Sequence, residues 1–252
     1  MPELQPSGGS ASSTAGAPKT FVLVHGAWHG GWCWRRVADL LTARGHRVFA
    51  PTLTGVAERS HLANAGVDLS THVDDVVNLL KWEELDDVVL CGHSYGGMVI
   101  SGVAEKAPVG SIGSLVYLDA FLPDDGHSLL DYTNAEGREG GPMVEEGEAT
   151  GLVSPIPAEI FAVNAKDRAW VDAQCTRQPY RTFTEKVRLA GARERIANKT
   201  YVLATGYPGL AFPMFAAKVK DDPAWRYHEV ACGHDVMLDA PERLAEILEG
   251  AA

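Results

Sequence analysis

Ser94 stands in the pattern Gly-x-Ser-x-Gly, and the residue types on either side of it suit a nucleophile. A short β-branched run at 88–90 precedes the pattern, and a helical pattern follows it. Between a strand and a helix, such a turn is so tight that glycine is favoured at positions 92, 96 and 97, and the serine hydroxyl stands clear of the sheet. The sequence therefore predicts a nucleophilic Ser94. The alternative is a glycine-rich turn with an idle serine.

A serine hydroxyl is a poor nucleophile until a base takes its proton, and nine histidines compete for that role. His234 lies in the loop between the last predicted strand and the last predicted helix, where its ring could swing over Ser94. His25 and His93 lie beside glycines at turns, where histidines more often brace loops. The remaining histidines fall in contexts away from the strand ends: His29, His46, His61, His72, His127 and His228. We therefore expect His234 to be the base, with a loop-bracing role as the alternative.

The third member of a triad must hold the imidazole in one tautomer and offset its positive charge. The usual position, just after the penultimate strand, corresponds to 205–209 and contains no carboxylate. Asp119 ends the preceding strand and keeps the chain order Ser, Asp, His. Asp235 adjoins His234 and could not easily reach its own neighbour's ring. The charged stretch at 221–222 (Asp221 and Asp222) is typical of a solvated surface. We predict Asp119 to be the acid, with a capping or bracing aspartate as the alternative.

Acyl transfer also needs hydrogen-bond donors for the developing oxyanion, each contributing about 3 to 4 kcal/mol. The backbone N–H of Tyr95, directly after the nucleophile, is one expected donor. The other is the backbone N–H of Ala27, in the loop that follows the first strand. The expected substrate-binding side chains are Trp28, His29 and Met237, each with core packing as the alternative. In the inserted segment, position alone suggests that Phe161, Trp170 or the Pro179-Tyr180 turn sets the acyl and alcohol preference.

Strands and helices alternate along the chain, which predicts a doubly wound, mostly parallel α/β sheet. The predicted strands are 21–24, 47–50, 88–90, 114–118, 200–204 and 225–230. Apolar residues at helical spacing predict helices around 37–41, 73–80 and 244–248, the last with a start at 239–242 that resembles a capping box. In such sheets, ligands bind beyond the carboxyl ends of the strands. Ser94, Asp119 and His234 each follow the end of a predicted strand, so we expect them at this edge.

The composition predicts four segments. Residues 1–19 are rich in Ser, Gly, Ala and Pro and predict a flexible N-terminal tail. Residues 20–122 and 191–252 predict two parts of one core. Residues 123–190 are rich in Gly, Pro and Glu without strand-like runs, which predicts a cap of short helices and irregular chain packed over the sheet.

The net charge and the cysteines argue against a nucleic-acid-binding, membrane or metal-binding protein. The formal net charge of −11 argues against a nucleic-acid or anionic membrane surface. No apolar run approaches the roughly 18 residues of a membrane helix, and the N-terminus does not resemble a secretion signal. Four scattered cysteines without metal-like spacing predict reduced thiols in the cytoplasm, and neither a metal nor a cofactor is expected.

With these residues in place, the chain resembles the α/β-hydrolase superfamily, and within it the branch of plant methyl esterases and hydroxynitrile lyases with their bacterial esterase relatives. The motifs that carry the resemblance are FVLVHGAWHGGWCW at 21–34, GHSYGGM at 92–98, VYLDAFLPD at 116–124 and GHD at 233–235. The similarity runs from about residue 20 to the C-terminus and is weakest across the cap. It implies a six-stranded parallel sheet that lacks the first two strands of the full fold.

Two departures from this branch are informative. Plant members carry the acid where this chain has Tyr207, and usually an alanine where it has Asp119. The carboxylate has moved, which strengthens the assignment of Asp119. The lyases place a threonine at the position of Gly26 and a lysine at that of Asp235. That lysine stabilises departing cyanide, which an aspartate would oppose, so the lyase activity is disfavoured.

The leading hypothesis is a cytoplasmic, metal-free serine carboxylesterase that acts on small-molecule esters through an acyl-enzyme intermediate. A small-molecule receptor on the same fold is the alternative from another class. A hydrolase of a lactone, an amide or a carbon–carbon bond would use the same residues and stays open. The expected partner is a small ester, with no nucleic acid and no membrane. A homodimer is left open because the sequence does not reveal the oligomeric state.

Overall fold

The central sheet contains six strands in the order β2-β1-β3-β4-β7-β8. The computed structural model describes residues 17–133, 141–207, 209 and 211–252. The strands are β1 (Thr20–Val24), β2 (Arg47–Phe49), β3 (Val88–His93), β4 (Ile112–Leu118), β7 (Asn198–Ala204) and β8 (Arg226–Val230). Each neighbouring pair is parallel. The prediction of a doubly wound, six-stranded parallel α/β sheet is confirmed.

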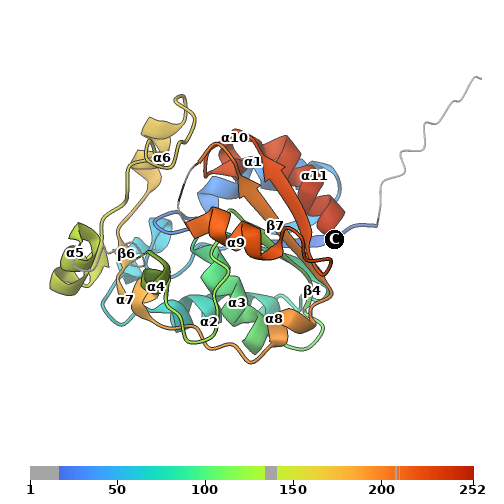
Figure 1. Ribbon diagram of the computed structural model, residues 1–252, viewed down its shortest axis with the longest axis horizontal. Coiled ribbons are helices and arrows are strands. Elements are labelled where there is room, and N and C mark those ends of the chain that lie inside the picture. The colour runs from blue at the N-terminus through green and yellow to red at the C-terminus, as the bar shows by residue number, and fades with distance from the viewer. Residues whose placement is uncertain (1–16, 134–140, 208, 210) are drawn as a thin grey trace, which may run out of the picture.

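Helices cover both faces of this sheet (Figure 1). On one face lie α1 (Arg35–Ala43), the short α10 (Val236–Asp239) and α11 (Pro241–Ala251). On the other lie α2 (Leu69–Trp82), α3 (Gly96–Lys106) and the short α8 (Ala192–Arg195). Two separate clusters of buried apolar side chains fill the two interfaces. Among the residues described above, no helix is both long enough and apolar enough to cross a membrane.

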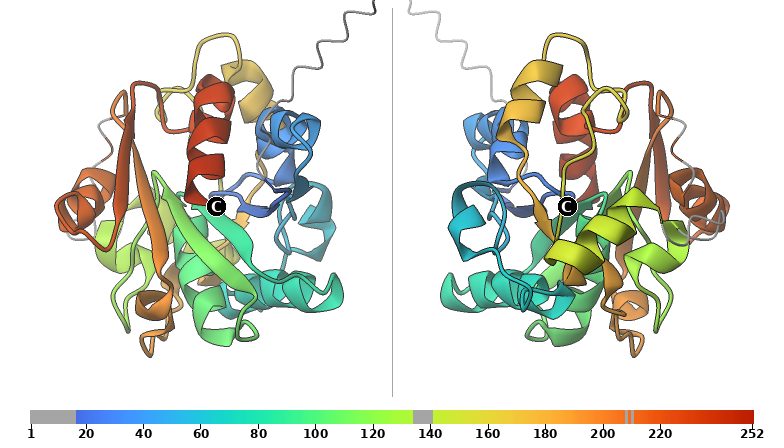
Figure 2. Two further views of the ribbon diagram at one scale, coloured as in Figure 1. Left: turned by 90° about the vertical axis from the view of Figure 1, so that its right-hand side faces the viewer. Right: turned by 90° about the vertical axis from the view of Figure 1, so that its left-hand side faces the viewer.

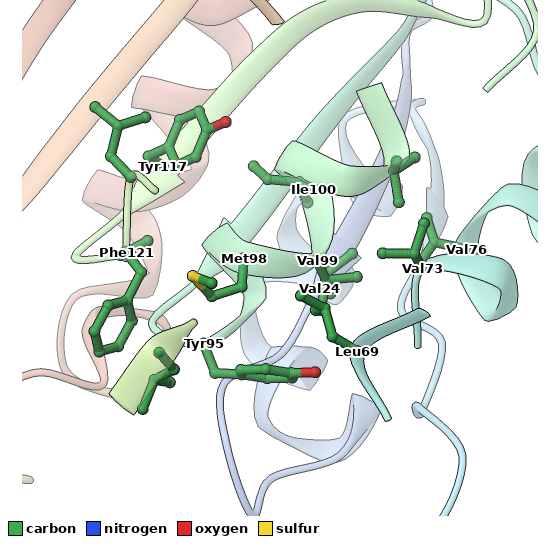
Figure 3. Packing of buried hydrophobic residues seen from close by; sticks show 14 of the residues in the cluster. Val24, Leu69, Val73, Val76, Tyr95, Met98, Val99, Ile100, Tyr117 and Phe121 are labelled. Carbon is green, nitrogen blue, oxygen red and sulfur yellow. The ribbon is translucent and has the colours of Figure 1, made fainter. Parts of the chain in front are cut away.

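The α2–α3 interface is closely packed, which holds the helix after Ser94 firmly in place (Figure 3). Met98, Val99 and Ile100 of α3 are fully buried. On α2, Val73 and Val76 face α3, and a Cβ added to Gly102 would come within 2.6 Å of the Val73 side chain. Close packing of this kind leaves little room for movement, so α3 provides a rigid support for the turn that precedes it.

The start of the last helix differs from the predicted capping box. Asp239 ends α10, and the N-cap of α11 is Ala240, which makes no side-chain cap bond. Pro241 supplies the first turn of α11, a position where its missing N–H is not needed. The Asp239 carboxylate instead accepts from Asn164 Nδ2 at 2.6 Å and from the Gly233 amide at 3.2 Å. The prediction was wrong because a tertiary contact uses this carboxylate.

The segment between β4 and α8 forms a cap at one side of the sheet (Figures 1 and 2). Its helices are α4 (Leu129–Thr133), α5 (Pro142–Thr150), α6 (Arg168–Gln174) and α7 (Arg181–Thr184). It also contains a two-stranded antiparallel sheet of β5 (Leu152–Val153) and β6 (Gln178–Pro179), so the expectation that strands are absent was wrong. Each strand has two residues, too few for a periodic pattern to reveal. After β7 comes helix α9 (Ala211–Val219), which lies between the cap and the strand β7.

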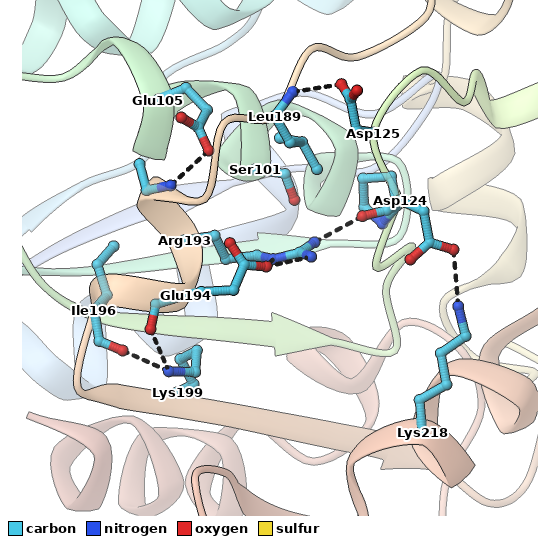
Figure 4. Close-up of polar contacts among 12 residues, drawn as sticks. Ser101, Glu105, Asp124, Asp125, Leu189, Arg193, Glu194, Ile196, Lys199 and Lys218 are labelled. Atoms are coloured by element: carbon cyan, nitrogen blue, oxygen red, sulfur yellow. Dashed lines mark hydrogen bonds and ion pairs between the residues drawn. The ribbon is translucent and has the colours of Figure 1, made fainter.

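The two ends of the cap segment are joined by hydrogen bonds (Figure 4). The Leu189 amide donates to Asp125 at 2.8 Å, and the Arg193 guanidinium donates to the Pro123 carbonyl at 2.7 Å. Ala192 N–H donates to Glu105 of α3 at 2.8 Å. The chain therefore leaves and re-enters the core at neighbouring points. The domain boundaries given above stay predictions, and residues 1–16 of the predicted tail lie outside the described residues.

A buried carboxylate ties the other side of the cap to α1. Asp167 accepts from both terminal nitrogens of Arg36, at 2.7 and 2.8 Å, and from Asn164 Nδ2 at 2.7 Å. The hydrogen bonds from Arg36 lower the pKa of Asp167 to about 2. A carboxyl pKa that is lower in the folded state adds stability above the unfolded pKa, near 4, and this stability is lost as the pH falls toward 2.

We expect Asp167→Asn to lower the free energy of unfolding at pH 7 by about 1 to 2 kcal/mol, a value reduced for solvent screening because the Arg36 side chain is 37% exposed. Urea unfolding at pH 7, 5, 4 and 3 measures this, and the difference from the unmodified protein should shrink below pH 4. Asp74→Asn is the control, because its ion pair with Lys106 is exposed on both sides. A pH-independent difference would contradict the prediction.

Candidate active site

Ser94 lies in the turn between β3 and α3, with a backbone φ of 52°. This left-handed conformation is strained for serine and persists only where the surroundings enforce it. Three hydrogen bonds do so here. The Ser94 N–H donates to the Leu118 carbonyl at 3.2 Å, and its carbonyl accepts from Gly97 N–H at 3.0 Å and Phe121 N–H at 3.1 Å. The turn is thereby attached to the end of β4 as well as to α3.

The two outer glycines of the motif are required by close backbone approach. A Cβ on Gly92 would lie 2.5 Å from the Gly96 carbonyl oxygen. A Cβ on Gly96 would lie 2.8 Å from the Val24 carbonyl oxygen of β1. Neither position can hold a side chain without moving backbone, so the tight turn and the glycines depend on each other.

The predicted base and acid, His234 and Asp119, contact each other. His234 Nδ1 lies 2.6 Å from Asp119 Oδ2, and both side chains are almost inaccessible to solvent. The other Asp119 oxygen accepts from the Ala204 N–H at 3.0 Å. Burial raises the pKa of Asp119, and the hydrogen bond with His234 opposes this rise. Since a carboxylate can only accept, Nδ1 of His234 carries a proton and Nε2 is left as the basic nitrogen.

Aromatic rings surround the His234 imidazole. Phe212 stacks on it with centroids 4.8 Å apart and an interplanar angle of 17°. Tyr207 and Phe161 lie 5.0 and 5.3 Å away. The position where plant members carry the acid thus holds a ring that packs against the histidine. The backbone also contributes, since His234 N–H donates to the Phe161 carbonyl at 3.0 Å.

Ala27 and Tyr95, whose amides are the predicted oxyanion donors, line the same cavity as Ser94 and His234. Ala27 follows β1, and Tyr95 follows Ser94 directly. Within the described part of the chain, neither N–H donates to a carbonyl or side-chain acceptor. Free amides beside a nucleophile are suited to an oxygen that becomes negative during reaction.

This cavity has a volume of about 740 Å³ and lies between the core and the cap. Aromatic side chains form much of its wall: Trp28, Tyr95, Phe121, Tyr132, Phe161, Phe183, Tyr207 and Phe212. The cap adds aliphatic residues that no pattern in the sequence identifies, among them Met143, Val153, Ile156 and Ile160. A concave apolar site with a few convergent polar groups is the usual form of a small-molecule site.

Two of the predicted substrate-binding residues do not line the cavity. Met237 is fully buried and packs in the cluster beneath α1 and α11. His29 is 3% exposed, and its ring bonds to the Ala27 carbonyl and to Asp235. These predictions were wrong because closeness in sequence to a site residue does not fix the side of the backbone. Trp28 does border the cavity.

The cap residues suggested by position divide in the same way. Phe161 borders the cavity, whereas Trp170 packs edge-on against Trp32 with centroids 4.9 Å apart. The Pro179-Tyr180 turn is not among the lining residues. The charged pair Asp221 and Asp222 is exposed, as expected.

His25 and His93 brace loops, in agreement with the sequence. His25 Nδ1 donates to the Gly26 carbonyl at 2.8 Å while its Nε2 accepts from Leu53 N–H at 3.0 Å, and burial lowers the pKa of His25 to about 3. His93 Nε2 donates to the His234 carbonyl at 3.1 Å. In the part of the chain that the structure describes, no three His, Cys, Asp or Glu side chains are grouped so that they could hold a metal ion.

Comparison with known proteins places this geometry in a family. The model of the alpha/beta hydrolase family matches residues 21–247. A carbendazim hydrolyzing esterase from Nocardioides sp. (strain SG-4G) is 46% identical over 237 residues, which cover 90% of this chain and 97% of that protein. Methylesterase 1 of Arabidopsis thaliana is 39% identical over 119 residues, covering 43% of this chain and 41% of the plant protein.

Solved structures agree with the sequence comparison. An extracellular alpha/beta-hydrolase from a Paenibacillus species, described as sharing structural and functional homology with tobacco salicylic acid binding protein 2, matches with a TM-score of 0.80 and 26% identity. The match covers 93% of this chain and 99% of that one. The chain therefore belongs to the alpha/beta hydrolase family and is a carboxylic ester hydrolase within it.

Proposed function

We propose that this ester hydrolase cleaves methyl esters of small, flat aromatic acids and methyl carbamates of small, flat aromatic amines through an acyl-enzyme intermediate on Ser94. The observation that carries the mechanism is the 2.6 Å contact between His234 Nδ1 and Asp119, at a cavity that Ser94 also borders. The substrate class follows from the aromatic wall of that cavity and from the name of the 46% identical relative.

In the first half-reaction, Ser94 Oγ attacks the ester carbonyl carbon while His234 Nε2 accepts the hydroxyl proton. Asp119 holds the ring and stabilises the imidazolium that forms. The carbonyl oxygen becomes an oxyanion and accepts hydrogen bonds from the N–H groups of Ala27 and Tyr95. The tetrahedral intermediate then expels methanol, whose oxygen takes the proton back from His234 Nε2.

In the second half-reaction, a water molecule gives a proton to His234 Nε2 and attacks the acyl carbon. Collapse of the second intermediate breaks the bond to Ser94 Oγ, which recovers the proton from His234. An ester releases the carboxylic acid. A carbamate releases a carbamic acid, which loses carbon dioxide without help from the protein. No step requires a group beyond the triad, the two amides and water.

The shape of the cavity supports a flat acyl part. Trp28 and Phe183 pack edge to face at 5.6 Å, and Trp28 also lies 6.1 Å from Phe161. Rings held in this way offer faces and edges to a planar aromatic ligand. A volume of about 740 Å³ exceeds what a short aliphatic acid would fill.

We expect kcat/KM for carbendazim and methyl 2-naphthoate to exceed that for methyl butyrate by at least about tenfold, because aromatic acyl parts bury more apolar area in this cavity. The measurement is methanol release over a panel that varies acyl and alcohol parts independently and includes a lactone and an anilide. Equal rates for aromatic and short aliphatic methyl esters would contradict the proposed substrate class.

Binding without turnover is the second candidate, since salicylic acid-binding protein 2 of Nicotiana tabacum is 39% identical over 111 residues. That match covers 44% of this chain and 42% of the tobacco protein. A receptor would bind an aromatic acid tightly and hydrolyse its methyl ester negligibly. A burst of methanol equal to the enzyme concentration, followed by steady turnover, excludes this alternative.

For the compartment, we propose the cytoplasm. The four cysteines are free, and Cys33 and Cys91 are buried as reduced thiols. Burial raises the pKa of both thiols, which keeps them protonated and unreactive. Fractionation of the native host tests this proposal.

A further inference from the structure

We infer that His29, held by Asp235, is a positioning residue for the oxyanion hole: it holds the Ala27–Trp28 peptide in place. This peptide directly follows the Gly26–Ala27 peptide, which carries the Ala27 N–H and has its own carbonyl bonded to His25, so the donor residue Ala27 is fixed on both sides. The inference depends on the proposed function, because Ala27 N–H is a catalytic donor only if Ser94 attacks a carbonyl. Neither His29 nor Asp235 borders the cavity, so neither would touch the substrate.

The His29 ring makes two short hydrogen bonds, and both partners are acceptors. Nδ1 lies 2.8 Å from the Ala27 carbonyl oxygen, and Nε2 lies 3.1 Å from Asp235 Oδ2. Both ring nitrogens must therefore carry protons, which makes His29 an imidazolium. Burial works against this charge, but the Asp235 carboxylate raises the pKa of His29 well above its usual value. The His29 charge in turn lowers the pKa of Asp235 below its usual value, despite burial.

The same peptide is held from the other side by the cap. Trp28 N–H donates to Gln178 Oε1 at 3.0 Å, and Gln178 Nε2 donates to Thr182 Oγ1 at 2.9 Å, which fixes the orientation of the amide. The Ala27–Trp28 peptide thus has its carbonyl bonded to His29 and its N–H bonded to Gln178. Trp28 has a φ of 64°, so these bonds hold a backbone conformation that would otherwise relax.

The ion pair also joins the two loops that the reaction must align. His29 follows the donor Ala27 by two residues, and Asp235 follows the base His234 directly. The groups that face the pair are His93, with Nε2 at 3.9 Å from Asp235 Oδ1, Cys175, with Sγ at 4.0 Å from His29 Nδ1, and the stacked ring of Trp32. Buried ion pairs add little to stability compared with apolar packing, so a directional role explains this one better.

The test uses His29→Gln and Asp235→Asn with two substrates, methyl 2-naphthoate and its thionoester, in which sulfur replaces the carbonyl oxygen. Sulfur is a weak acceptor, so the thionoester depends less on the oxyanion donors. We expect kcat for the ester to fall by about 10- to 100-fold, less than the 100- to 1000-fold loss of a whole donor. KM should stay nearly constant, and the ratio of ester to thionoester rates should fall with kcat.

His46→Gln is the matched control, because His46 pairs with Glu249 at 3.0 Å next to the amino end of β2, away from the cavity. That variant should leave the rate ratio unchanged. Equal losses for ester and thionoester in the two test variants would indicate a structural role and overturn the inference. If His29→Gln fails to fold, Asp235→Asn, which keeps the side-chain shape, decides alone. If Ser94→Ala keeps its activity, the proposed function fails. If Ser94→Ala loses its activity but the ratio of ester to thionoester rates stays constant in His29→Gln and Asp235→Asn, this inference alone fails.

Discussion

Ser94→Ala is expected to abolish ester hydrolysis, with kcat for methyl 2-naphthoate lower by about a millionfold. The substitution removes the oxygen that would form the acyl-enzyme, and the hydroxyl of the adjacent Tyr95 is already bonded to His72 at 2.9 Å. The residual rate would come from the Ala27 and Tyr95 amides and from substrate binding alone. Single-turnover kinetics measure the loss, and a fluorophosphonate probe, which reacts with activated serines, should no longer label the protein.

The fold should tolerate this change. Alanine suffers the same φ strain as serine at 52°, and the turn is held by backbone bonds that the substitution keeps. Ser101→Ala is a matched control, because Ser101 is fully buried in α3 and bonds to the Gly97 carbonyl at 2.7 Å and to Tyr117 at 2.9 Å. It should cost about 1 kcal/mol of stability and retain probe labelling. Substantial turnover in Ser94→Ala would mean that another group is the nucleophile.

The sheet could be predicted because its signals are local. Buried parallel strands are continuous apolar runs, and each predicted strand overlaps an observed one to within a few residues. The turn at Ser94 is partly local, since Gly92 is dictated by the Gly96 carbonyl four residues along the chain, whereas Gly96 is dictated by the Val24 carbonyl of the neighbouring strand. Asp119 was reached by combining strand ends with chain order, which is topological information that a sequence contains.

The remaining parts depend on tertiary contacts that leave no local trace. Asp239 looked like a helix cap and instead bonds to Asn164, 75 residues away in sequence. His29 looked like a pocket residue, but its partner Asp235 lies 206 residues further along the chain. The cap has neither long strands nor strong helical periodicity, so its contribution to the cavity wall could not be read from spacing.

Asp119→Asn should lower kcat by about 10⁴-fold, because it places the proton on the wrong nitrogen of His234. In the unmodified protein, one Asp119 oxygen accepts from Ala204 N–H at 3.0 Å and the other from His234 Nδ1–H at 2.6 Å. The asparagine oxygen will keep the Ala204 N–H, since an amide nitrogen there would face another donor. Its NH₂ then donates to Nδ1, which must give up its proton. The proton moves to Nε2, the nitrogen that has to accept from Ser94.

Asp221→Asn is the control, because it removes an equal charge from an exposed position and should leave kcat unchanged. Measurement of kcat and KM across both variants, with nitrogen-15 NMR of the histidine tautomers, separates a tautomer change from a loss of folding. Near-normal activity in Asp119→Asn would mean that Asp119 is not the acid.

The same substitution should not weaken the fold. Burial raises the folded-state pKa of Asp119, so the ionised side chain costs stability as the pH rises above its unfolded value near 4. A neutral asparagine removes that cost, and at pH 7 the variant should unfold at an equal or higher urea concentration than the unmodified protein. Loss of activity together with unchanged or greater stability is what a carboxylate kept for chemistry predicts, whereas a bracing aspartate would show the reverse: retained activity and a weaker fold.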